Sequence, residues 1–176
     1  GFELYQEMLE EAITAARAQS AGLAPPEDAF APQITVGASV LIPEDYVPDL
    51  SLRMGLYRRI GDITERAEID GLAAELIDRF GKLPDEVKNL LAVVEIKNHC
   101  RRAGVARLEA GPKGAVVTFR EGGFVNVPAL IGFLQKQAGT AKLRPDQKLV
   151  YARDWREVRQ RLNGSLQLAR ALAALV

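Results

Sequence analysis

The chain has 176 residues, 48% of them hydrophobic, and its 23 lysines and arginines balance its 23 aspartates and glutamates. This length and apolar content fit a globular domain with a real core and a short appendage. Zero net charge argues against a dedicated nucleic-acid-binding module, because such modules are usually basic overall.

Cys100 is the single cysteine of the sequence, which excludes an intrachain disulfide and fits a reducing cytoplasm. No apolar run approaches the roughly 20 residues that a membrane-spanning helix needs, and no signal peptide opens the chain. The chain begins at Gly1 without an initiator methionine, which indicates a fragment of a longer protein. We therefore expect a cytoplasmic fragment that is monomeric by itself.

The first 33 residues are expected to form a separate segment. Residues 3–19 carry an apolar stripe at helical spacing, with acids early and Arg17 late, as the helix dipole favours. Residues 22–32 hold three prolines and predict a linker. We place the domain boundary there, with a helix and proline-rich linker in residues 1–33 and one domain in residues 34–176.

A strand and two helices are predicted next. Apolar residues alternate over residues 34–41, which is typical of a strand. Asp49 is expected to cap a helix that runs to about Ile60, and Thr64 is expected to cap the following one. The apolar stripe of this following helix comprises Ile69, Leu72, Ala73, Leu76, Ile77 and Phe80.

The end of that helix and the start of the next are marked by local signals. Gly81 suits a C-terminal cap, which needs a residue that tolerates positive φ. Pro84 suits the first position of a third helix, which we expect to run to about Ala103.

The second half predicts two β-hairpins around a short helix. Segments 105–110 and 115–120 flank a turn at 111–114, and segments 141–144 and 147–152 flank Pro145 and Asp146. Residues 128–137 are predicted to be helical. Asp154 and Glu157 predict a capping box for a last helix, which Gly164 is expected to interrupt. The predicted class is α+β: a helical bundle portion followed by two β-hairpins around a helix, packed as one compact domain.

The helix that ends at Phe80 has an unusual second face. At about 100° per residue, Gly71, Ala74, Glu75 and Asp78 group away from the apolar stripe. A flat surface of small residues beside two carboxylates fits a close-packing basic partner. The alternative is a solvated helix face with an incidental glycine.

Several segments together resemble the C-terminal domain of the bacterial transcription-repair coupling factor, Mfd. They are residues 43–49, Arg53, residues 56–60, residues 75–81 with Leu83 and Pro84, and residues 132–137; residues 1–5 and 9–12 are similar to the helix that follows the motor domains in that family. The order and spacing of these segments carry the resemblance, since none of them is a catalytic signature.

This resemblance implies a regulatory domain of a DNA translocase that removes stalled RNA polymerase and recruits nucleotide-excision repair through UvrA. The domain would close against an N-terminal module that resembles UvrB, mask its UvrA-binding surface and restrain the motor. Glu75 and Asp78 match the residues that face arginines of that module, and Arg79 and Phe80 match too. Gly71 departs from the bulkier residue expected at its place, and with Ala74 it completes the expected interface.

No catalytic, cofactor or metal site is predicted. The turn at 111–114 lacks the spacing of a phosphate loop, and adjacent His99 and Cys100 point about 100° apart on a helix. We therefore expect a non-enzymatic part of an ATP-dependent translocase, which meets DNA and RNA polymerase through the rest of that protein. The rival interpretation is a nucleic-acid-binding accessory module that uses its scattered arginines, namely Arg53, Arg58, Arg59, Arg101, Arg102, Arg153, Arg156, Arg159 and Arg161.

Overall fold

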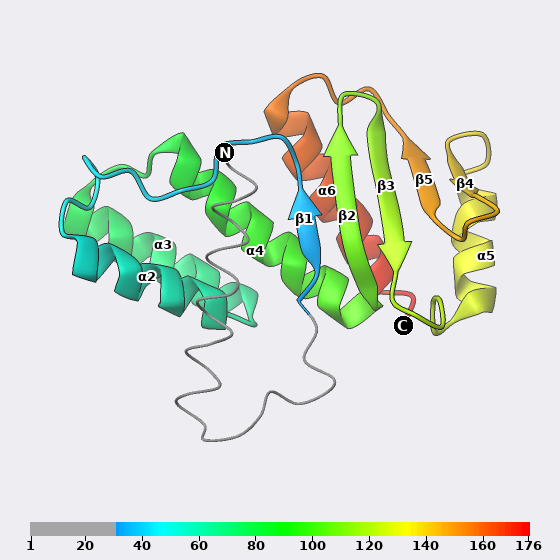
Figure 1. Ribbon diagram of the computed structural model, residues 1–176, viewed down its shortest axis with the longest axis horizontal. Coiled ribbons are helices and arrows are strands. Elements are labelled where there is room, and N and C mark those ends of the chain that lie inside the picture. Colours follow the sequence, from blue (N-terminus) through cyan, green and yellow to red (C-terminus); the bar gives the residue numbers. More distant parts are fainter. Residues whose placement is uncertain (1–30) are drawn as a thin grey trace. The chain divides into compact units, whose positions relative to one another are not determined.

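The computed structural model describes residues 31–176 of the chain (Figure 1). These residues form two compact units, residues 39–95 and residues 31–38 together with 96–176. The predicted helix over residues 3–19 and most of the predicted linker lie outside the described residues. The proposed domain boundary at residue 33 therefore stays a prediction.

The first unit consists of helices α2 (Leu50–Asp62), α3 (Arg66–Phe80) and the N-terminal half of α4 (Asp85–Ala103). Asp49 caps α2 as predicted, because its Oδ1 accepts a hydrogen bond from the Leu52 N–H at 2.9 Å. The fully buried side chains of this unit are Val47, Leu56, Tyr57, Ile60, Leu76 and Val87, and they form its core.

The predicted C-terminal cap of α3 is confirmed and the predicted N-terminal cap is wrong. Gly81 follows the last helical residue with a φ of 92°. The helix begins one residue later than expected, after Glu65, whose N–H donates to Glu68 Oε1 at 3.3 Å. The Thr64 hydroxyl donates to the same Glu68 carboxylate at 3.4 Å, and Glu65, not Thr64, is the N-cap residue.

The apolar stripe of α3 is narrower than predicted. Ile69, Leu72 and Leu76 are buried, but Ile77 is 50% exposed. Ile77 is displaced by about 100° from Leu76 around the helix, so the core that buries Leu76 does not reach it. This correction adds an apolar side chain to the exposed surface of α3.

The second unit is built on a five-stranded mixed sheet within the described residues, with the order β1-β2-β3-β5-β4. Strands β2 (Val105–Gly111) and β3 (Gly114–Phe119) form the first predicted hairpin, and β4 (Ala141–Leu143) and β5 (Leu149–Ala152) form the second. Antiparallel pairing of β3 with β5 joins the two hairpins, and β1 (Gln33–Thr35) adds a parallel strand beside β2. The predicted α+β class is confirmed.

The first strand is shorter than the alternating pattern indicated. Pairing with β2 ends at Thr35, and Gly37 follows with a φ of 62°, outside the extended region. Burial nevertheless continues to alternate through Val36, Ala38 and Val40. The alternating pattern therefore predicted which side chains are buried, but pairing with β2 is limited to residues 33–35.

This unit also contains the C-terminal half of α4 and the helices α5 (Val127–Lys136) and α6 (Val158–Ala173). Helix α6 lies against one face of the sheet (Figure 1). The predicted capping box of α6 is wrong. The Glu157 N–H donates to Gln160 Oε1 at 3.1 Å, while Asp154 pairs with Arg156. The expected interruption at Gly164 is also wrong, since α6 continues through it.

Cys100 lies fully buried in the C-terminal half of α4, and burial raises the pKa of its thiol to about 12. Because the thiolate is the nucleophile, we expect Cys100 to resist iodoacetamide at pH 8 in the native chain and to react in guanidinium chloride. Peptide mass spectrometry over time would measure this. Ser51→Cys, at an exposed position of α2, supplies a rapidly labelled control; equal labelling rates at the two sites would contradict burial.

Candidate functional site

The predicted interface residues lie on α3, in the first unit. Gly71, Ala74, Asp78 and Arg79 are exposed, and Glu75 keeps 36% of its side chain exposed. A methyl group added at Gly71 would meet no other atom within 4 Å. The assignment of these residues to an interface stays a prediction, and the structure shows that the surroundings of the two acids differ.

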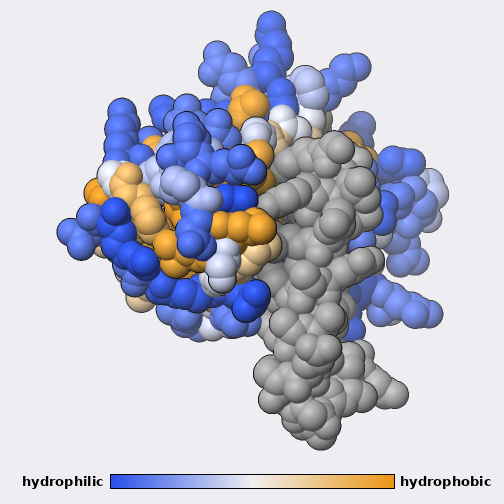
Figure 2. Space-filling model, turned by 60° about the vertical axis from the view of Figure 1, so that its left-hand side comes forward, coloured by the Kyte–Doolittle hydropathy of each residue, from blue (hydrophilic) through white to orange (hydrophobic). Residues whose placement is uncertain are grey.

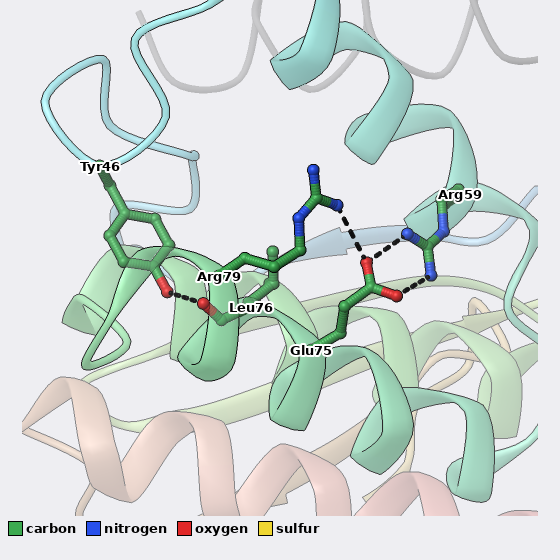
Figure 3. Close-up of polar contacts among 5 residues, drawn as sticks. All are labelled: Tyr46, Arg59, Glu75, Leu76 and Arg79. Carbon is green, nitrogen blue, oxygen red and sulfur yellow. Dashed lines mark hydrogen bonds and ion pairs between the residues drawn. The ribbon is translucent and has the colours of Figure 1, made fainter.

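Glu75 is held by two arginines of its own unit (Figure 3). Arg59 of α2 donates through Nη1 to Oε2 at 2.6 Å and through Nη2 to Oε1 at 3.2 Å. Arg79, one turn along α3, donates through Nη1 to Oε2 at 3.3 Å. The first contact links neighbouring helices with the parallel two-bond geometry that makes arginine–carboxylate pairs directional.

This pairing lowers the pKa of Glu75, chiefly through the hydrogen bond from Arg59, and it raises the pKa of Arg59. Because the folded-state pKa of Glu75 lies below the unfolded one, its contribution to stability is complete above the ordinary glutamate range. That contribution is lost as the pH falls through the lower, folded-state value. Near neutral pH the three side chains form a charged cluster.

Tyr46 holds the last turn of α3 in place. Its hydroxyl lies 2.8 Å from the carbonyl oxygen of Gly81. It lies 3.1 Å from the carbonyl oxygen of Leu76 (Figure 3). Its ring packs against Phe80 with centroids 5.7 Å apart, and the Arg79 guanidinium lies 5.0 Å from the Phe80 ring centroid. The loop before α2 thereby fixes the turn that carries the candidate site.

Asp78 differs from Glu75 because no hydrogen bond or ion pair reaches its side chain from residues 31–176. It lies one helical turn after Ala74 and next to the half-exposed Ile77. Figure 2 brings forward the left-hand side of Figure 1, where α2 and α3 lie, and hydrophobic atoms are visible there among hydrophilic ones. Helix α3 therefore presents a carboxylate without a partner among residues 31–176 and, about 100° around the helix, a half-exposed apolar side chain.

Sequence reasoning placed Glu75 and Asp78 correctly on one side of α3, but it missed the roles of Arg59 and Tyr46. The spacing of Glu75 and Arg79, four residues apart on a helix, could have indicated their ion pair. No local signal could have paired Glu75 with Arg59, because these residues lie on different helices, 16 positions apart.

Many of the arginines that suggested nucleic-acid binding contact their own fold. Arg53 is 7% exposed and donates to the Val47 carbonyl at 2.9 Å, and Arg156 pairs with Asp154 at 2.8 Å. Arg153 stacks on Tyr151, 3.9 Å from the ring centroid. Arg161 donates to four backbone carbonyls, those of Val36, Gly37, Trp155 and Arg156. These contacts do not favour the rival interpretation, which needs arginines that are available to phosphates.

Other kinds of site find no support in the described part of the chain. Across residues 31–176, no group of three or more His, Cys, Asp or Glu side chains is arranged to hold a metal ion. Within the same range, no helix is both long and apolar enough to cross a membrane.

A sequence model of the TRCF domain matches residues 36–130, which is more than half of the chain and includes all of α3. The chain belongs to the TRCF domain family. Its relatives include transcription-repair-coupling factors of Rickettsia conorii, 42% identical over 86% of this chain, and of Escherichia coli, 36% identical over 98%. That of Haemophilus influenzae is 33% identical over 99%. The resemblance stated from the sequence is thereby confirmed.

The fold is also similar to a crystal structure of the C-terminal domain of transcription-repair coupling factor. The TM-score is 0.71 at 22% identity, over 83% of this chain and 94% of the other. This TRCF domain spans only 13% to 15% of the length of the three relatives above. What a whole protein of this family does is therefore taken up as a proposal.

Proposed function

We propose that this domain is a non-catalytic, autoinhibitory part of a DNA translocase that couples transcription to nucleotide-excision repair. In this proposal, the exposed face of α3 closes on a UvrB-like N-terminal module of the same protein. It covers the surface that UvrA would bind and restrains the motor. The rest of the protein contacts DNA and RNA polymerase.

The accessible face of α3 carries this proposal. Gly71 and Ala74 present no bulk that would keep a partner at a distance, and Asp78 offers a carboxylate without a partner among the described residues. The half-exposed Ile77 precedes Asp78 in sequence and lies about 100° away around the helix. A basic surface that docks here would pair the charge and cover the apolar side chain together.

The proposed mechanism is competition followed by release. The α3 face occupies basic residues that UvrA would otherwise contact, so UvrA and this domain exclude one another. Ligands of the whole protein open it only if they favour the open state by more than the free energy of the interdomain contact. A contact of a few kcal/mol would keep the closed state dominant.

The test is Glu75→Ala combined with Asp78→Ala in the intact protein. We expect the double variant to capture several-fold more UvrA in a pull-down and to hydrolyse ATP faster, because the masking contact has lost both acids. Glu109→Ala with Glu121→Ala removes the same charge from exposed positions of the second unit and should change neither readout. Unchanged UvrA capture by a folded double variant would refute the proposal and leave a solvated helix face.

A further inference from the structure

Charge is distributed unevenly between the two units of the described chain. Residues 39–95 hold 7 lysines and arginines and 12 aspartates and glutamates, which gives a net charge of −5. Residues 31–38 and 96–176 together hold 15 lysines and arginines and 5 aspartates and glutamates, which gives +10. The zero net charge of the whole chain therefore hides a strongly basic second unit, and such an excess is the electrostatic signature of a polyanion-binding surface.

The sheet of the second unit has one face that no described helix covers. Helix α6 packs on the face that buries Leu108, Val117 and Leu149, and no described helix lies in front of β2, β3 and β5 (Figure 1). Side chains alternate between the two faces along each strand. The paired residues Val116 and Val150 therefore point to the other face, where they stay partly exposed. We call this uncovered surface the open face.

Two lysines on neighbouring strands share the open face. Lys142 of β4 pairs with Val150 of β5 in the antiparallel register. Lys148 precedes Val150 by two residues, and its carbonyl accepts the Arg144 N–H at 2.9 Å, so the ladder continues to it. Because residues two apart on a strand share a face, the two lysines are diagonal neighbours, with Cα atoms about 7–8 Å apart. Neither ammonium group has a hydrogen-bond or ion-pair partner in residues 31–176.

Two arginines extend this basic surface, and each already has an acid beside it. Arg107 of β2 pairs with Thr118 of β3 on the open face, and its guanidinium lies 3.5 Å from the Glu109 carboxylate. Arg144 lies 3.1 Å from Asp146 at the β4–β5 turn. Exposed ion pairs of this kind contribute little to stability, so a phosphate group can compete for either arginine. The two lysines need no such exchange, and they therefore supply the first contacts to an anion.

We propose that the open face binds the phosphate backbone of double-stranded DNA, independently of sequence. Lysine ammonium groups contact phosphates as point charges and carry no base-specific information. Single strands are usually held by bases that stack on aromatic side chains, and the strand residues of the open face within residues 31–176 include no aromatic one. These lysines also differ from the arginines of the rival interpretation, many of which contact their own fold. The DNA contact goes beyond the proposed function and does not depend on α3, so either can fail without the other.

The experiment measures binding of a fluorescein-labelled DNA duplex to the 176-residue chain by fluorescence anisotropy over a range of salt concentrations. We expect a Kd on the order of 10⁻⁵ M near physiological salt, and a steep loss of affinity as salt rises, since phosphate contacts release counterions. Lys142→Gln combined with Lys148→Gln should weaken binding about tenfold and reduce the salt slope by about 2. Arg159→Gln combined with Arg170→Gln is the matched control, because it removes the same charge from exposed positions of α6. The control should lower affinity far less.

Three results would overturn the proposal. The first is an absence of binding even at low salt, or binding that salt leaves unchanged; salt-sensitive self-association without DNA binding would assign the open face to the acidic residues 39–95 of a second copy. The second is an equal loss in both double variants, because the DNA would then respond only to the net charge of the unit. The third is tighter binding of single-stranded DNA or of double-stranded RNA. Unchanged denaturation midpoints, followed by Trp155 fluorescence, establish that the surface substitutions leave the fold intact.

Discussion

Gly164→Ala is expected to destabilise the second unit, although alanine is the better helix former. A methyl group at this position of α6 would lie 2.2 Å from Cζ2 and 2.4 Å from Cε2 of the Trp155 indole. Trp155 is only 6% exposed and has little space into which it can move. Overpacking of this kind costs about 1–3 kcal/mol, which exceeds the roughly 1 kcal/mol that alanine gains in a helix.

Denaturant unfolding followed by the fluorescence of Trp155, the one tryptophan of the chain, measures this cost at the site of the change. Gly132→Ala is the matched control, because Gly132 lies in α5 of the same unit and a methyl group there would meet nothing within 4 Å. We expect this control to be neutral or slightly stabilising. Equal midpoints for the two variants would contradict the close packing of Gly164 on the indole.

Tyr57→Phe should destabilise the first unit by about 1–3 kcal/mol, because it leaves a buried polar group without its partner. The Tyr57 side chain is 1% exposed, and its hydroxyl oxygen accepts the Ile42 N–H at 2.7 Å. Ile42 is itself 3% exposed, so water cannot replace the lost acceptor. The loss would appear as a lower denaturation midpoint with an unchanged dependence on denaturant.

Tyr46→Phe provides the comparison, since it removes a hydroxyl that also bonds backbone carbonyls. Those carbonyls, of Leu76 and Gly81, lie in a more exposed setting, where water can take over the bonds. We expect a smaller loss than for Tyr57→Phe. A larger loss for Tyr46→Phe would show that the end of α3, and not the buried core around Tyr57, limits the stability of this unit.

Local chemistry in the sequence was sufficient wherever one segment decides its own structure. Asp49 caps α2 with its own carboxylate, and Gly81 adopts the positive φ that ends α3. The turn at 111–114 closes the first hairpin as predicted, with Gly111 opposite Gly114. In each case the interacting groups lie within a few residues of one another, so the spacing of residue types carries the information.

The caps that were predicted wrongly show how such local signals compete. Asp154 could have capped the last helix, but its carboxylate pairs with Arg156, and the helix begins after Glu157 instead. At α3, Glu68 is within reach of both the Thr64 hydroxyl and the Glu65 N–H. In both places, several neighbouring polar residues could have capped the helix. The spacing of residue types does not show which of them does so.

Tertiary structure alone decided which distant segments meet. The sequence determined the α+β class, most helix and hairpin positions, and the side of α3 on which Glu75 and Asp78 lie. It did not determine that the two hairpins join by pairing of β3 with β5. Nor did it determine that Arg59 forms an ion pair with Glu75 and not with Asp78. Periodicity shows which face of an element is apolar, but the pairing of faces and charges from separate elements depends on how the whole chain packs, which no single segment encodes.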